Sequence, residues 1–88
     1  MPYITKVARE ALNGNIPEPK TVGELNYCFT KTARTYIEEI NAIYQKEGIN
    51  YQIINDVLGA LEGAKLEFYR RVVVPYEDQK IIENGDAY

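Results

Sequence analysis

Two long stretches of this chain repeat apolar residues every three or four positions, and only a short turn separates them. The first runs from Val22 to Glu47 and the second from Tyr51 to Val74. A period near 3.6 residues is that of an amphipathic α-helix, and no stretch alternates in the way a half-buried strand does. Because a short turn makes consecutive helices antiparallel neighbours, we expect an all-α fold built on an antiparallel helical hairpin.

Helix-capping residues mark the ends of both stretches. Thr21 and Glu24 fit a capping box, in which the Thr hydroxyl accepts a hydrogen bond from the Glu amide and the Glu side chain reaches back. Gly48 is a residue type that commonly ends a helix, and Asn50 suits the N-cap of the next one. These signals place helix boundaries at both ends of the turn.

Shorter helical segments flank the hairpin. The N-terminal one is followed by Asn13 and Gly14, a pair typical of a left-handed C-cap. Near the other end, three β-branched valines precede Pro75 and disfavour helical dihedrals, so we expect a kink or break at Val74. The expected elements of this single helical domain, residues 1–88, are helices over 4–12, 22–47, 51–74 and 75–83.

Residue types missing from the composition exclude several kinds of catalytic site. The 88 residues include no His and one Cys, so there is no imidazole base, no His-bound metal and no CxxC zinc site. Cys28 falls on the apolar stripe of the first long helix, and we interpret it as a core residue. We therefore expect a protein that is not an enzyme, with no catalytic residue, no metal and no cofactor.

The charge balance and the apolar runs limit the partners. A formal net charge of −3 argues against a DNA or RNA partner, which would need a cationic face. Apolar runs fall far short of the roughly 20 residues that span a membrane, so we expect no membrane partner. The start of the chain lacks the features of a signal peptide, and a lone thiol suits a reducing compartment. The expected location is cytoplasmic.

Small and surplus apolar residues on the second long helix point to association. Gly59 and Gly63 lie four residues apart, each followed by an alanine, and form a smooth strip. The strip suits tight packing on the first long helix, a crossing between subunits, or a ligand resting on the backbone. Leu66 and Tyr69 fall outside the single mutual face of a hairpin. This surplus, in so short a chain, favours a homo-oligomer.

Aromatic and basic side chains cluster on the same helix. Eight Tyr against two Phe is a high ratio, and Tyr suits interfaces and wet pockets. Rings beside guanidinium groups can stack on a base while Arg grips phosphate, although a solvated face with weak ion pairs is the competing interpretation. The candidate ligand-binding residues are Lys65, Arg70 and Arg71 for phosphate, Tyr27, Tyr69 and Tyr76 for stacking, and Asn26 and Asn55 for polar edges.

Five short sequence strings together carry a resemblance to a protein family. They are GELNY at 23–27, YQIINDV at 51–57, AKLEFYRR at 64–71, PYEDQK at 75–80 and ENGD at 83–86. With these strings the chain resembles a family of short uncharacterised proteins from bacteriophages, prophages and bacteria, which open Met-Pro-Tyr-Ile as here. The resemblance implies a small accessory protein in a bacterial cytoplasm. Small phage proteins of similar size include oligomeric sponges that sequester nucleotide immune signals, which is an analogy only.

Three functional hypotheses follow. The leading one is a non-enzymatic homo-oligomer that binds and sequesters a nucleotide-like anionic small molecule between subunits. The second is a protein-interaction adaptor or inhibitor that docks on a host or phage protein. The third is a metal-dependent nucleotide hydrolase, for which Glu62 and Glu67 lack the spacing of known magnesium-binding carboxylates, since five residues place them roughly 140° apart on a helix.

Overall fold

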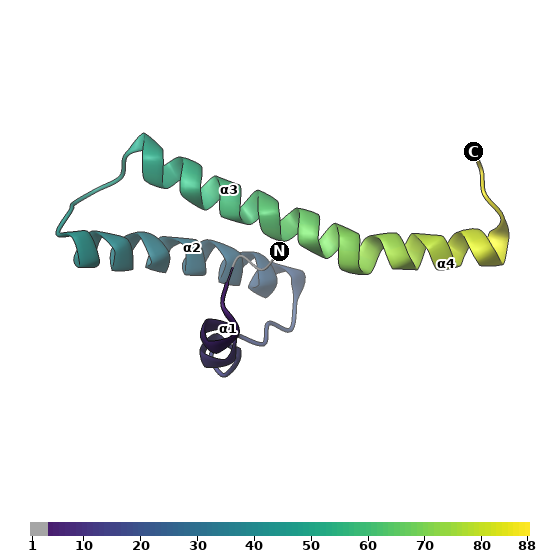
Figure 1. Ribbon diagram of the computed structural model, residues 1–88, viewed down its shortest axis with the longest axis horizontal. Helices are drawn as coiled ribbons and strands as arrows, with labels where there is room; N and C mark the ends of the chain where they lie inside the picture. Colours follow the sequence, from purple (N-terminus) through teal and green to yellow (C-terminus); the bar gives the residue numbers. More distant parts are fainter. Residues whose placement is uncertain (1–3) are drawn as a thin grey trace. The chain divides into compact units, whose positions relative to one another are not determined.

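All regular structure in the described residues, 4–88, is helical in this computed structural model, which confirms the all-α class (Figure 1). The chain divides into two units, Met1–Tyr44 and Gln45–Tyr88. The predicted domain also includes residues 1–3, which lie outside the described residues. The elements are α1 (Lys6–Asn13) and α2 (Val22–Tyr44) in the first unit, and α3 (Tyr51–Phe68), a π-helical turn (Tyr69–Val73) and α4 (Val74–Asn84) in the second.

The short helix α1 begins at a cap that the sequence pattern did not reveal. The amide of Ala8 donates a hydrogen bond to the hydroxyl of Thr5 over 3.2 Å, so Thr5 is the N-cap. At the other end, Gly14 has a φ of −73°. The predicted left-handed C-cap at Asn13-Gly14 is therefore wrong, because Gly14 continues with right-handed dihedrals.

The capping box predicted at the start of α2 is present in a shifted form. The Glu24 amide donates to the Thr21 hydroxyl over 3.0 Å, as predicted. The Glu24 carboxylate accepts from the amide of Lys20 over 3.0 Å, one residue before the N-cap. Two free backbone amides at the helix start are satisfied in this way, which stabilises the beginning of α2.

The end of α2 lies before the predicted one. The helix stops at Tyr44 instead of Glu47, because Gln45 adopts a left-handed φ of 54°. Gly48, with a φ of 77°, lies in the turn beyond the helix end. Asn50 then caps α3, since its side-chain oxygen accepts from the Ile53 amide over 2.9 Å, which confirms the predicted N-cap.

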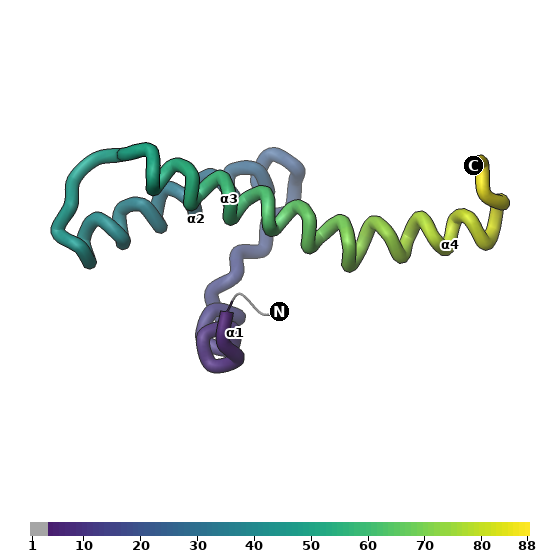
Figure 2. Tube along the Cα trace, turned by 45° about the horizontal axis from the view of Figure 1, so that its top comes forward, coloured from purple at the N-terminus to yellow at the C-terminus, as the bar shows by residue number. Residues whose placement is uncertain are grey.

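The second long helix continues past Pro75. The dihedrals of Val74 are helical, with φ −61° and ψ −50°, so of the predicted kink or break the break is wrong, and the irregularity there is a π turn. The amide of Val74 donates to the carbonyl of Tyr69, five residues earlier, and this defines the π turn. Pro75 has no amide hydrogen, and its ring would clash with the carbonyl of Arg71 in a regular α-helix. Figures 1 and 2 show the chain running from α3 into α4 without interruption.

The helix ends at Asn84, where the glycine that follows reverses the sign of φ. Gly85 has a φ of 85°, and its amide donates to the carbonyl of Ile81 over 2.8 Å. The sequence predicted the end one residue earlier, at residue 83. This close agreement reflects the strong preference of glycine for left-handed positions after a helix.

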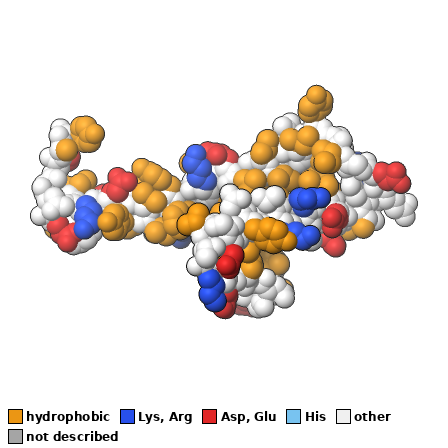
Figure 3. Space-filling view, turned by 180° about the vertical axis from the view of Figure 1, so that it is seen from behind, with side chains coloured by type: hydrophobic (Ala, Val, Ile, Leu, Met, Phe, Trp, Pro, Cys, Tyr) orange, Lys and Arg blue, Asp and Glu red, His pale blue; other side chains and the backbone are white. Residues whose placement is uncertain are grey.

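The second unit is one continuous helix and has no internal core. Ile53 is the one buried hydrophobic residue of the described chain. Along the π turn and α4, hydrophobic side chains lie exposed between charged ones, as Figure 3 shows. A helix of this kind draws most of its stability from packing of an apolar face. The second unit therefore has apolar side chains at its surface.

Candidate anion-binding site

The most closely connected polar groups of the second unit lie at the junction of α3 and the π turn. The Nε of Arg71 donates to Oε2 of Glu67 over 2.8 Å. The Nη2 of Arg70 lies 3.5 Å from the same carboxylate oxygen. Spacings of three and four residues on a helix allow both contacts, and the structure has both arginines on the one carboxylate.

The cluster carries more positive than negative charge. Two guanidinium groups share one carboxylate, and the Arg70 and Arg71 side chains are 68% and 70% exposed. The hydrogen bond from Arg71 and the nearby charges of both arginines lower the pKa of Glu67 from its ordinary value of 4.5. Glu67 is therefore ionised at neutral pH, and several N–H donors of the two arginines remain available to a soluble anion.

The π turn contains three of the predicted ligand residues, Tyr69, Arg70 and Arg71. An i→i+5 turn is rare in proteins and is often found where a side chain has a functional role. Pro75 supplies a sufficient cause for it here. Whether its cause is functional or is Pro75 alone, the turn changes which residues on its two sides share a face of the helix.

Two further candidates on this helix make local contacts of their own. The Lys65 Nζ lies 3.6 Å from the Glu62 carboxylate, so its charge is paired at the surface. The ring of Tyr76 carries the Lys80 ammonium 5.5 Å from its centroid, a cation–π contact that the sequence reading missed. The spacing of four residues between Tyr76 and Lys80 was the available signal.

The remaining predicted residues belong to other parts of the chain. Asn55 precedes Arg70 by 15 residues on a helical chain, about 22 Å along the axis at 1.5 Å per residue. Asn26 and Tyr27 belong to α2, in the other unit. The described residues therefore form a compact candidate site of Glu67, Arg70 and Arg71 with Tyr69 beside it.

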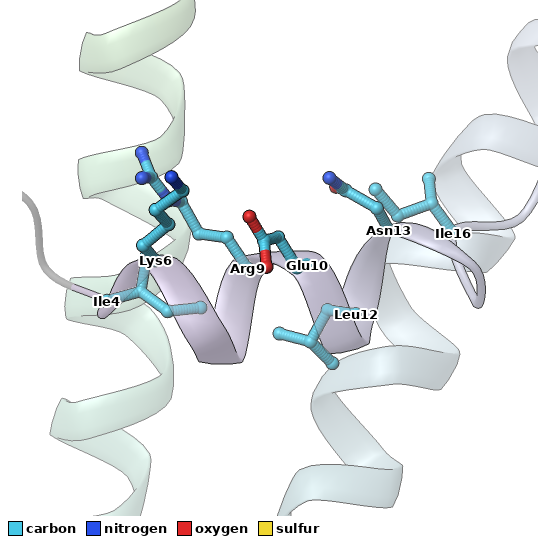
Figure 4. Close-up of a pocket in the computed structure, with 7 residues that line it drawn as sticks. All are labelled: Ile4, Lys6, Arg9, Glu10, Leu12, Asn13 and Ile16. Atoms are coloured by element: carbon cyan, nitrogen blue, oxygen red, sulfur yellow. The ribbon is translucent and has the colours of Figure 1, made fainter.

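A separate shallow hollow lies against α1 in the first unit (Figure 4). Its volume is about 450 Å³, and Lys6 and Arg9 extend from one side of the helix at its rim. None of the predicted ligand residues contributes to it. The residues that line it are Ile4, Lys6, Arg9, Glu10, Leu12, Asn13 and Ile16.

No group of three or more Cys, Asp or Glu side chains in residues 4–88 is placed to hold a metal ion. No helix in that part of the chain is long and apolar enough to cross a membrane.

Taken together, the described residues define an all-helical protein whose long second helix carries an exposed arginine pair and exposed apolar side chains. The chain belongs to the family described as a domain of unknown function, DUF6899, whose model matches residues 1–87. The match, like the resemblance seen in the sequence, covers nearly the whole chain. No curated protein and no solved structure matches it.

Proposed function

We propose that this protein is a non-enzymatic binding protein that sequesters a nucleotide-like anionic small molecule. Arg71, together with Arg70, binds phosphate, and Tyr69 offers a ring for stacking. The observation that carries the proposal is the convergence of two exposed guanidinium groups on the single carboxylate of Glu67, which leaves a local excess of positive charge on an acidic protein.

The same proposal includes an assembly. The two long helices pack as an antiparallel hairpin, and the hairpins associate as a homo-oligomer. Support comes from the second unit, a single helix with exposed apolar side chains, because such a helix gains stability only by covering them. Several copies also bring several arginine pairs to one ligand, which raises its affinity.

The setting that we propose is the cytoplasm of a bacterial host cell, with a phage-type accessory role such as anti-defence. In that role the protein would bind a nucleotide signal without changing it. Adaptor activity is the second candidate, and the apolar side chains of α4 favour it, since Tyr76 and Ile82 are 62% and 77% exposed.

Calorimetry with cyclic dinucleotides, cyclic trinucleotides and ADP-ribose tests the proposed ligand class. The expected result is binding to at least one of them, weakened about tenfold in Arg71→Gln because a charge-assisted hydrogen bond is lost. Arg34→Gln, an exposed arginine of α2, is the matched control and should leave binding unchanged. No binding to any of the three at high protein concentration would refute the ligand class.

Salt gives a second check on the same wild-type titration. If phosphate contacts carry the affinity, raising the salt concentration weakens binding, because exposed charges are screened within about 10 Å at 0.1 M. A pull-down that recovers one stoichiometric protein partner without any ligand dependence would favour the adaptor instead.

A further inference from the structure

The π turn changes which residues share a face of the long helix. Each α-helical residue turns the chain by about 100°, and a single π turn holds one residue more, so positions after it are set back by about 100°. Residues 66 and 81 would stand about 60° apart in an uninterrupted α-helix. With the π turn they are about 40° apart on the other side, with Val74 between them. The result is a second apolar face, here called the C-terminal face, made of Leu66, Tyr69, Val73, Val74 and Ile81.

Most of this face is uncovered in the single chain. Leu66 and Tyr69 are 59% and 50% exposed, and Ile81 is 42% exposed. Leu66 and Tyr69 are also the residues that a two-helix hairpin leaves without a partner. A continuous apolar face of this length, on a helix with no internal core, requires a second surface to pack on.

Charges along this face identify the partner. Arg70 and Asp78 are eight residues apart, about 80° in an α-helix, and the π turn brings them onto the same side of the C-terminal face. Within the described residues, Arg70 pairs with one carboxylate, that of Glu67, and shares it with Arg71. Within residues 4–88, neither Glu77 nor Asp78 forms an ion pair with a cation. The segment from Lys65 to Val73 therefore has three cations and one carboxylate, while the segment from Val74 to Asn84 has three carboxylates and one cation.

We propose that the C-terminal face binds a second copy of this chain in antiparallel orientation, with the two-fold axis at Val73–Val74. In that register Leu66 packs on Ile81 of the other copy, and the two pairs of valines meet at the axis. Position 70 faces position 77 in this register, so Arg70 lies about 1.5 Å along the axis from Asp78 of the other copy and on the same flank, twice by symmetry. A parallel pairing in register would place Arg70 on Arg70 and Asp78 on Asp78, which like charges disfavour.

This inference rests on the proposed self-association and gives it an interface and a register. It places Arg70 and Tyr69 in the dimer interface, which leaves Arg71 as the phosphate contact of the proposed function and removes the stacking role of Tyr69. Arg70 pairs across the dimer, while Arg71, on the flank beside Glu67, stays accessible to an anion. The interface and the ligand site can therefore be tested with different variants.

Disulfide trapping tests the register directly. In a Cys28→Ser background, Leu66→Cys and Ile81→Cys are prepared separately and then mixed under mild oxidation. The antiparallel register predicts a disulfide-linked dimer in the mixture and none in either variant alone. Cross-linking of each variant with itself would show a parallel pairing and overturn the proposal, and so would the absence of cross-links in all three samples.

Charge reversal provides an independent measurement that needs no oxidation. Arg70→Asp should weaken dimerisation about tenfold, because two attractive pairs become repulsive. The double variant Arg70→Asp with Asp78→Arg should restore it. Arg34→Asp, the same change on α2, is the control and should have no effect. Failure of the double variant to restore dimerisation would overturn the register.

The outcomes separate this inference from the proposed function. If the wild type is an oligomer but the cross-links are parallel or absent, the interface is wrong and self-association stands. If the wild type is a monomer at every concentration, both the proposed interface and the proposed self-association are refuted. Ligand binding by Arg71 is measured separately by calorimetry, so a loss of binding is distinguished from a loss of dimerisation.

Discussion

Replacing Gly59 and Gly63 by alanine should stabilise this protein. Both glycines lie inside α3, and a Cβ added at either one meets no atom within 4 Å. Alanine in a helix interior is more stable than glycine by about 1 kcal/mol per site, because glycine loses more backbone entropy on folding. With no clash to offset the gain, the double variant should gain about 2 kcal/mol in the free energy of unfolding.

Thermal unfolding followed by far-ultraviolet circular dichroism measures this gain. About 1 kcal/mol shifts the Tm of a domain of this size by roughly 4–8 °C, so each single variant should melt higher by that amount. The control is Gly85→Ala. Gly85 has a φ of 85°, where alanine is strained, and that variant should melt lower.

The same variants test where subunits meet. The proposed dimer centres on Val73–Val74, away from the glycine strip, so native mass should not change in either alanine variant. A lower Tm, or dissociation of the oligomer, in Gly63→Ala would refute the reasoning. It would show that another helix crosses α3 in close contact with the glycines.

Three further predictions concern caps, the π turn and pH. Asn50→Ala should cost about 1 kcal/mol of stability, seen as a lower Tm, because the Ile53 amide loses its acceptor; an unchanged Tm would contradict the cap. Pro75→Ala should let the helix return to regular α geometry, which separates Arg70 from Asp78 on the helix surface. Dimerisation, measured by sedimentation, should then weaken, and undiminished dimerisation would contradict the role of the π turn. The lowered pKa of Glu67 means that its stabilising ion pairs are complete above pH 4.5 and are lost as the pH falls toward the folded-state pKa. Helical signal should therefore drop below pH 4.5 more in the wild type than in Glu67→Gln, and equal titrations would argue against the ion pairs.

Local capping was predictable because it depends on residue types at fixed spacing. Thr21 with Glu24, and Asn50, each need only a side-chain oxygen three residues before a free amide. The end of α2 was missed because a non-glycine residue, Gln45, takes the left-handed conformation that usually marks glycine. Residue propensities do not predict a left-handed conformation at a glutamine.

The π turn shows a different limit of sequence reasoning. Pro75 and its three preceding valines correctly mark an irregularity. A helix can accommodate a proline either by a break or by a single wider π turn. The structure shows the second, and the register of every later residue depends on it. The pairing of Glu67 with both arginines was within reach of i+3 and i+4 rules. These rules could not predict whether Asn26, Tyr27 or Asn55 lies near these arginines, because that depends on packing between elements far apart in the chain.

Native mass spectrometry of the wild-type protein tests the central claim most directly, since it reports the number of subunits and any bound ligand together. The account predicts an even multiple of the 10.1 kDa chain, with added mass from a small anion that Arg71→Gln loses. A bare monomer of 10.1 kDa at every protein concentration would contradict it.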